Sequence, residues 1–112
     1  MRRKLLVLGL AMAALAGCTT DPAVDRFTGE SHANATLKSD TLGTVRLLLR
    51  GRGCSGPIEQ IESTTLFYEP SNGTAGHLWG REQWVATACG RPFYFQVEFI
   101  EDGRGGTFFA VS

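Results

Sequence analysis

The stretch that decides the fold of this chain is Phe93-Tyr94-Phe95-Gln96-Val97-Glu98-Phe99-Ile100. Its large apolar residues Phe93, Phe95, Val97 and Phe99 occupy alternate positions and share one face of a predicted β-strand. In water, such a phenylalanine row would promote aggregation, so we predict that it faces the core. Tyr94 then faces solvent or a partner. The alternative is that the row is itself a binding surface and that Tyr94 and Ile100 point inward.

One further strand is predicted on each side of this one. Asp102-Gly103-Arg104-Gly105-Gly106 has the composition of a turn, and residues 107–111 return the chain as a strand. A phosphate-binding loop is disfavoured here because no helix follows the glycines. Residues 83–88 are rich in strand-forming side chains and end at Cys89-Gly90. The short turns between these three strands favour an antiparallel meander.

A sheet with one apolar face needs a cover, and the upstream sequence offers candidates for it. Residues 44–50 place Val45, Leu47 and Leu49 at alternate positions. This spacing predicts a strand that packs on the phenylalanine row. Upstream of it, residues 36–38 are compatible with a second, shorter strand.

The sequence between these two regions fits both a helix and a strand. Pro57 suits the first turn of a short helix that runs to about residue 63, and a strand fits the same residues. Residues 64–68 are β-branched and aromatic and predict a strand. The predicted fold class is therefore mainly β: a small antiparallel sheet or partial barrel with a C-terminal meander, one disulfide and room for one short helix.

The N-terminus is typical of an export signal. Met1-Arg2-Arg3-Lys4 is basic, an apolar run continues to Leu15, and Ala16 and Gly17 are small. The run is shorter than the roughly 20 residues that a membrane-spanning helix needs. Leu15-Ala16-Gly17-Cys18 resembles the lipobox of bacterial lipoproteins. The resemblance implies cleavage after Gly17, diacylglycerol on the Cys18 thiol and acylation of the new N-terminus, so residues 1–17 are expected to be a signal peptide.

The resemblance also implies a place in the cell envelope. Thr19 follows the cysteine where the enterobacterial sorting pattern has Asp for retention, which implies the outer membrane rather than the inner membrane. Removing residues 1–17 leaves eight basic and eleven acidic residues, a net charge of −3, which disfavours a nucleic-acid partner. Residues 18–33 are predicted to be the lipidated N-terminus and a flexible tether, and residues 34–112 the β domain.

The cysteine count predicts a disulfide. With Cys18 lipidated, Cys54 and Cys89 remain, and an even pair in an oxidising compartment favours a bond between them. A zinc site would need four ligands at close spacing, whereas His32 and His77 are isolated in the sequence. No metal and no cofactor other than the covalent lipid are predicted.

The sequence contains no pattern typical of an enzyme. His77 is interpreted as an ordinary surface histidine, and the glutamates show no acid–base spacing. Trp84 lies in a predicted strand and is expected in the core. Trp79, in a loop with glycine neighbours, is a candidate for an exposed aromatic binding surface together with Tyr68 and Tyr94. The arginines at positions 46, 50, 52, 81, 91 and 104 are expected to be scattered, and the alternative is one patch that faces anionic lipid headgroups.

The C-terminal half carries a pattern of its own, Glu82-x-Trp84, Cys89-Gly90 and Gly105-Gly106-Thr107. It resembles uncharacterised small bacterial lipoproteins and implies one structural unit. We therefore expect a non-enzymatic envelope lipoprotein that acts by binding or structural contact. One alternative is an inhibitor of a lytic enzyme, similar to lipoprotein lysozyme inhibitors, although only Ser71-Asn72-Gly73-Thr74 approaches their motifs. Another is an accessory subunit of outer-membrane assembly, whose usual leading helix pair is not visible here.

Overall fold

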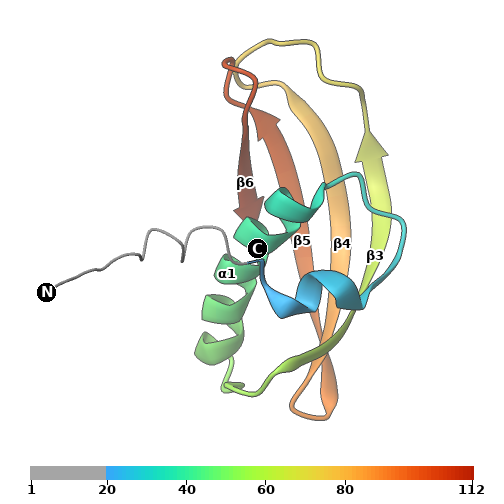
Figure 1. The fold of residues 1–112 in the computed structure, drawn as a ribbon, viewed down its shortest axis with the longest axis vertical. Helices are drawn as coiled ribbons and strands as arrows, with labels where there is room; N and C mark the ends of the chain where they lie inside the picture. Colours follow the sequence, from blue (N-terminus) through green and yellow to red (C-terminus); the bar gives the residue numbers. More distant parts are fainter. Residues whose placement is uncertain (1–19) are drawn as a thin grey trace, which may run out of the picture.

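A computed structural model of the chain describes residues 20–112, and the predicted lipidation site Cys18 lies outside them. The described part is one sheet with one long helix against it (Figure 1). The strand order is β2-β3-β4-β5-β6. The elements in chain order are the 3₁₀ helix η2 (Pro22–Arg26), β2 (Phe27–Gly29), α1 (Ala35–Gly51), β3 (Ile58–Tyr68), β4 (Leu78–Ala88), β5 (Arg91–Glu101) and β6 (Thr107–Val111).

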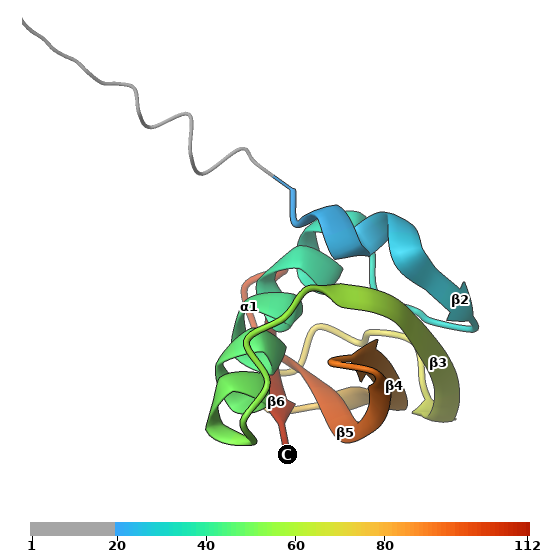
Figure 2. The same ribbon diagram turned by 90° about the horizontal axis from the view of Figure 1, so that it is seen from below.

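The prediction of a mainly β fold with a single helix and one disulfide is confirmed. Strands β3 to β6 form an antiparallel meander. Strand β2 pairs in parallel with β3, so the sheet is mixed rather than purely antiparallel. The helix that Pro57 could have started is not formed, because residues 58–68 belong to β3. The sheet curls, and α1 lies against its concave side (Figure 2).

The phenylalanine row of β5 faces the core, as predicted. Phe93, Phe95, Val97 and Phe99 are all buried, whereas 58% of Tyr94 is exposed. Trp84 of β4 lies opposite Phe95 in the register and is also buried. The alternative in which the row is the binding surface is therefore wrong.

The cover of the row is a helix, so the strands predicted over residues 44–50 and 36–38 are wrong. Leu42, Val45 and Leu49 are buried and are three and four positions apart, which is the spacing of one helical face. Leu47, which a strand would have turned inward, is 61% exposed. The helix starts at Asn34, whose Oδ1 accepts the backbone N–H of Leu37 at 2.8 Å.

The end of α1 carries the chain directly to the disulfide. The N–H of Gly53 donates to Arg50 O at 3.0 Å, and the N–H of Cys54 donates to Leu49 O at 2.9 Å. These are the two bonds of a Schellman motif, and Gly53 has the positive φ (86°) that the motif requires. Cys54 is bonded to Cys89 in the β4–β5 turn, with a Cα–Cα distance of 6.0 Å, as predicted.

The prediction of a flexible tether through residue 33 is wrong for the described part of that segment. The carboxylate of Asp21 accepts Arg46 Nε at 2.9 Å and Arg46 Nη2 at 2.6 Å. Farther on, β2 joins the sheet, and Gly29 packs so closely that a Cβ there would lie 2.3 Å from Ser63 O. Residues 21–29 are thus part of the folded domain. No helix within residues 20–112 is long and apolar enough to cross a membrane.

Candidate functional site

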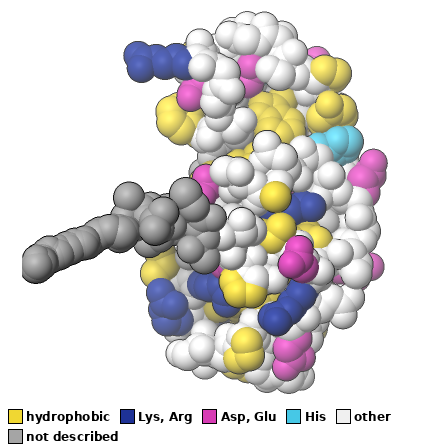
Figure 3. Space-filling model, in the orientation of Figure 1, with side chains coloured by type: hydrophobic (Ala, Val, Ile, Leu, Met, Phe, Trp, Pro, Cys, Tyr) yellow, Lys and Arg dark blue, Asp and Glu magenta, His cyan; other side chains and the backbone are white. Residues whose placement is uncertain are grey.

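Two adjoining cavities lie where the N-terminal turns of α1 face the upper part of the sheet. Their volumes are about 310 and 230 Å³, and we call the pair the aromatic groove. Figure 3 shows apolar side chains exposed in a hollow at this end of the molecule. Both cavities are lined by His32, Trp79, Gly105, Gly106 and Thr107. The larger one adds Asn34, Thr36, Leu37 and Asp40, and the smaller one adds Tyr68, Ser71 and Glu101.

Aromatic rings form a corner of this groove. Trp79 stacks on the buried Phe99, with ring centroids 5.0 Å apart, and its Nε1–H donates to Thr107 Oγ1 at 3.3 Å. Tyr68 meets Trp79 edge-on, at 6.4 Å and 87°, and stacks on His32 at 3.7 Å. Two aromatic planes therefore meet at nearly a right angle, which offers flat apolar surfaces to a ligand.

A bulge in β4 gives Trp79 its place. The pairing register between β4 and β5 shifts between Leu78 and Gly80, and such irregularities re-aim side chains. Gly80 is needed next to it, because a Cβ there would lie 3.1 Å from Cδ2 of Phe99. The indole thus rests on the core and also lines the groove.

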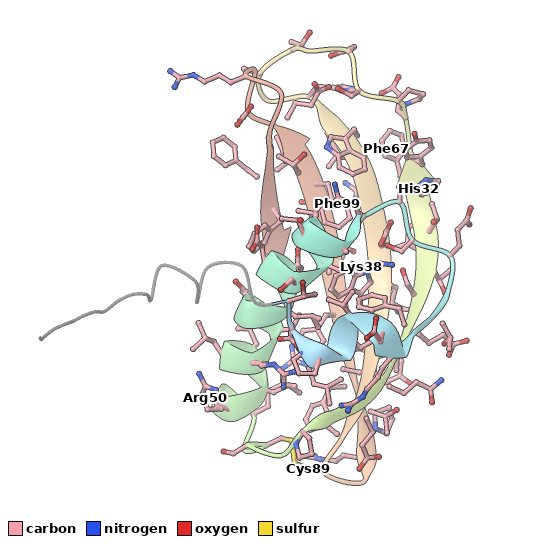
Figure 4. All side chains as sticks on the ribbon, in the orientation of Figure 1. His32, Lys38, Arg50, Phe67, Cys89 and Phe99 are labelled. Carbon is pink, nitrogen blue, oxygen red and sulfur yellow. A yellow bond between two sulfur atoms is a disulfide. The ribbon has the colours of Figure 1, made fainter. Side chains whose placement is uncertain are left out.

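The buried carboxyl group of Glu82 holds the loop that carries His32. Its Oε2 accepts the backbone N–H of His32 at 2.7 Å, and its Oε1 accepts Ser31 Oγ at 2.8 Å. Ser63 Oγ at 3.2 Å and Trp84 Nε1 at 2.9 Å complete the set of donors. Four donors satisfy a carboxyl group that has no contact with solvent. The β2–α1 loop is thereby fixed against the sheet, and His32 lies beside the end of β3 that carries Phe67 (Figure 4).

His77 is not the ordinary surface histidine that the sequence indicates. Its Nδ1 lies 2.6 Å from Glu101 Oε2, and its Nε2 lies 2.9 Å from Glu69 Oε1. Both ring nitrogens can donate only in the protonated imidazolium, so the two carboxylates favour the charged ring. The hydrogen bonds to Glu69 and to Glu101 raise the pKa of His77.

Glu101 ties the β3–β4 loop to the sheet. Ser71 Oγ donates to its Oε1 at 2.6 Å, and the backbone N–H groups of Asn72 and Gly73 each donate to the carboxylate at 2.8 Å. These bonds, Ser71 foremost, together with His77, lower the pKa of Glu101 to about 2. Because Ser71 bonds Glu101 rather than His77, the cluster orders a wall of the groove and contains no serine–histidine pair. Within residues 20–112 no three or more Cys, His, Asp or Glu residues are arranged to hold a metal ion.

The cluster of His77, Glu69 and Glu101 predicts that the free energy of unfolding falls at both ends of the pH range. The His77 contribution is fully present below its ordinary pKa of 6.5 and is lost as the pH rises through the raised pKa. The Glu101 contribution is present above its ordinary pKa of 4.5 and is lost as the pH falls toward about 2. The urea midpoint and the amide exchange of residues 69–77, followed against pH, measure both losses. His77→Gln should remove the alkaline loss, and His32→Gln should keep it; an unchanged alkaline limb in His77→Gln contradicts the assignment.

The structure places Trp79 and Tyr94, two candidates for an aromatic binding surface, on different faces of the sheet. Trp79 lines the groove on the helix side of the sheet. Tyr94 alternates with the buried Phe93 and Phe95, so it lies on the opposite face of the sheet. The two therefore do not form one surface. The disulfide lies elsewhere again, since Cys89 and His32 are at opposite ends of the molecule (Figure 4).

Four of the arginines make individual contacts. Arg46 pairs with Asp21, and Arg81 pairs with Glu98 at 2.9 Å. The guanidinium groups of Arg52 and Arg91 each lie 4.5 Å from the ring centroid of a core phenylalanine, Phe95 and Phe93 respectively. None of the arginines in the part of the chain that the structure describes lines the groove.

Several groove residues escape sequence reasoning. His32, Asp40 and Thr107 come from three different segments, so no local spacing reveals them. The one available signal is Glu82, which directly precedes the strand predicted over residues 83–88 and lies two positions before Trp84, on the same inward face. No family model matches the chain, and neither a curated protein nor a solved structure matches it, so its function is inferred from its sequence and from the geometry of this groove.

Proposed function

We propose that this chain is a lipoprotein of the cell envelope, anchored through lipid on Cys18, that acts without catalysis by binding a ligand in the aromatic groove. The observation that carries the binding role is the corner formed by Trp79 and Tyr68. The lipobox supports the anchor, and its Thr19 favours the outer membrane. A disulfide between Cys54 and Cys89 is in keeping with an oxidising compartment.

The lining of the groove supports a neutral or cationic ligand. Among residues 20–112, no lysine or arginine lines it, whereas Asp40 and Glu101 bring carboxylates. Glu101 already accepts several hydrogen bonds, but Asp40 is exposed and open to a ligand. The larger volume lies at the lower end of those typical of small-molecule sites, roughly 300–1,000 Å³, and the smaller volume lies below that range.

The inhibitor of a lytic enzyme stays the second candidate, on a separate observation. Leu66, Phe67 and Tyr68 are consecutive, and 53%, 37% and 47% of their respective surfaces are exposed. Tyr68 lines the groove and the other two precede it in β3, so the run suits a protein partner that inserts into the groove and extends along this strand. In this case Leu66→Ser should weaken the complex with the enzyme, whereas it should not affect a small ligand confined to the groove.

An NMR titration of the unlipidated domain tests the groove. The probes are purified cell-wall fragments, short cationic peptides and soluble envelope proteins, added separately. We expect one of these classes to shift the indole N–H resonance of Trp79 and the amide of Thr107. Asp40→Asn should reduce the response, and Tyr94→Ala, on the other face of the sheet, should keep it. Shifts confined to residues outside the groove would contradict the proposal.

The anchor makes a separate prediction. Cys18→Ser is expected to abolish membrane retention and to block cleavage after Gly17, because the thiolate is the group that accepts the lipid. Three acyl chains on Cys18 would hold the protein durably, since two lipid signals already suffice for stable anchoring. Detergent partitioning and intact mass measure both effects. A wild-type protein without acyl mass would refute the anchor.

A further inference from the structure

The domain holds the chain firmly at Asp21. Beyond the two bonds from Arg46, the backbone N–H of Asp21 donates to Ser39 Oγ at 2.9 Å. Ser39 and Arg46 lie two turns apart on the same side of α1. The hydrogen bond from Arg46 also lowers the pKa of Asp21, so the carboxylate stays charged at neutral pH. The point where the chain reaches the folded domain is therefore fixed on α1.

Very little chain separates this point from the lipidation site. Only three residue steps lead from Cys18 to Asp21, and consecutive Cα atoms are 3.8 Å apart, so the two Cα atoms can be at most about 11 Å apart. This distance is roughly the diameter of one α-helix with its side chains. Lipid on Cys18 would hold that residue at the membrane surface. The side of α1 that binds Asp21 must then stay close to the bilayer.

The exposed residues of α1 lie next to that side. At 100° per residue, Gly43, Leu47 and Arg50 form one stripe, opposite the buried residues and beside Ser39 and Arg46, whereas Asp40, one turn before Gly43, belongs to the groove. The exposed Leu47 lies between Arg46 and Arg50 in the sequence. An apolar side chain beside a cationic one suits the headgroup region of an anionic membrane. Arg50 supplies this charge, because Asp21 compensates the charge of Arg46. Figure 3 shows basic and acidic side chains interspersed on the face that it draws.

We propose that the exposed stripe of α1, with Leu47 and Arg50, lies on the anionic membrane that holds the lipid. The inference rests on the proposed anchor at Cys18. The helix covers the concave side of the sheet, so the outer face with Tyr94 points away from the membrane. The domain therefore keeps one orientation relative to the membrane, whereas a long tether would let it rotate freely.

The test uses the lipidated full chain in vesicles of phosphatidylethanolamine and phosphatidylglycerol. Leu47→Cys and Tyr94→Cys are labelled one at a time with an environment-sensitive fluorophore, and the vesicles contain nitroxide-labelled lipid headgroups. We expect quenching and a shift to shorter wavelength at position 47 and neither at position 94. Twelve glycine and serine residues inserted between Thr20 and Asp21 add a mean reach of roughly 20 Å and should abolish the quenching.

Paired variants isolate the attachment of Asp21. Arg46→Ala removes the two side-chain hydrogen bonds that hold Asp21 to α1 and should reduce the quenching at position 47, whereas Arg81→Ala, which removes the ion pair with Glu98 elsewhere, should not. Equal quenching at positions 47 and 94, or quenching that survives the insertion, overturns the orientation. If the protein still floats with the vesicles in either case, the orientation is refuted and the anchor at Cys18 is not. Protein without acyl mass that fails to float refutes the anchor itself.

Discussion

Phe95→Ala is expected to lower the free energy of unfolding by about 3–5 kcal/mol, which is typical of truncating a buried phenylalanine. Only 1% of Phe95 is exposed, and it lies opposite the equally buried Trp84 in the β4–β5 pairing. The truncation leaves a cavity between the sheet and α1 that the surrounding side chains can fill only in part. Urea unfolding followed by far-UV circular dichroism measures the loss.

The neighbouring residue provides the control. Tyr94 is on the same strand but on the outer face, so Tyr94→Ala should change the free energy of unfolding by no more than about 0.5 kcal/mol. If Phe95→Ala does not fold, Phe95→Leu should fold with a smaller loss, since it retains most of the volume. A midpoint that Phe95→Ala leaves unchanged would contradict the assignment of Phe95 to the core.

The C-terminal meander could be predicted from the sequence because its information is local. The alternation in β5 extends over eight residues, and the turns on both sides of it are short and rich in glycine. Each strand therefore reveals its own inward face, and short turns leave an antiparallel neighbour as the simplest pairing. The same reasoning assigns Phe93 and Phe99 to the core.

The helix could not be assigned from the same kind of evidence. Over residues 44–50, Val45 and Leu49 fit a strand of period two and a helix of period 3.6 equally well. The window has to be extended to Leu42 and to the Asn34 cap before the helical spacing is distinguished. Leu47 is the misleading residue, because it is apolar at a position that the helix turns toward solvent.

The groove and the His77 cluster depend on contacts between distant segments. Glu69 and Glu101 are 8 and 24 positions from His77 in the sequence, and they meet it only because β3 and β5 end near the same loop. The sequence offers Trp79 and Tyr68 as exposed aromatic residues, but nothing in it reveals that their rings meet. The attachment of Asp21 to the domain escapes prediction for a similar reason, because its partner Arg46 is 25 residues away.

Breaking the Cys54–Cys89 bond is expected to lower the free energy of unfolding by about 2–5 kcal/mol. The bond joins residues 35 positions apart, and in the chain-entropy model a loop of this size contributes roughly 3–4 kcal/mol by restricting the unfolded chain. Urea unfolding of Cys54→Ser/Cys89→Ser measures the loss, and wild-type protein with a reductant should reproduce it. An unchanged midpoint in both experiments would show that the bond does not stabilise the domain.

The backbone of the β4–β5 turn refines this prediction. Cys89 has φ 53° and Gly90 has φ 74°, so both residues of this two-residue turn are in the left-handed region that a type I′ hairpin requires. Asn tolerates this conformation better than most residues with a side chain, and Asn-Gly is a preferred pair for the turn. Cys54→Ser/Cys89→Asn should therefore lose less stability than Cys54→Ser/Cys89→Ser, although both lack the bond. A smaller loss with Asn separates the strain of the turn from the constraint that the disulfide imposes. Equal losses in the two variants would mean that the turn contributes nothing to stability beyond carrying the cysteine.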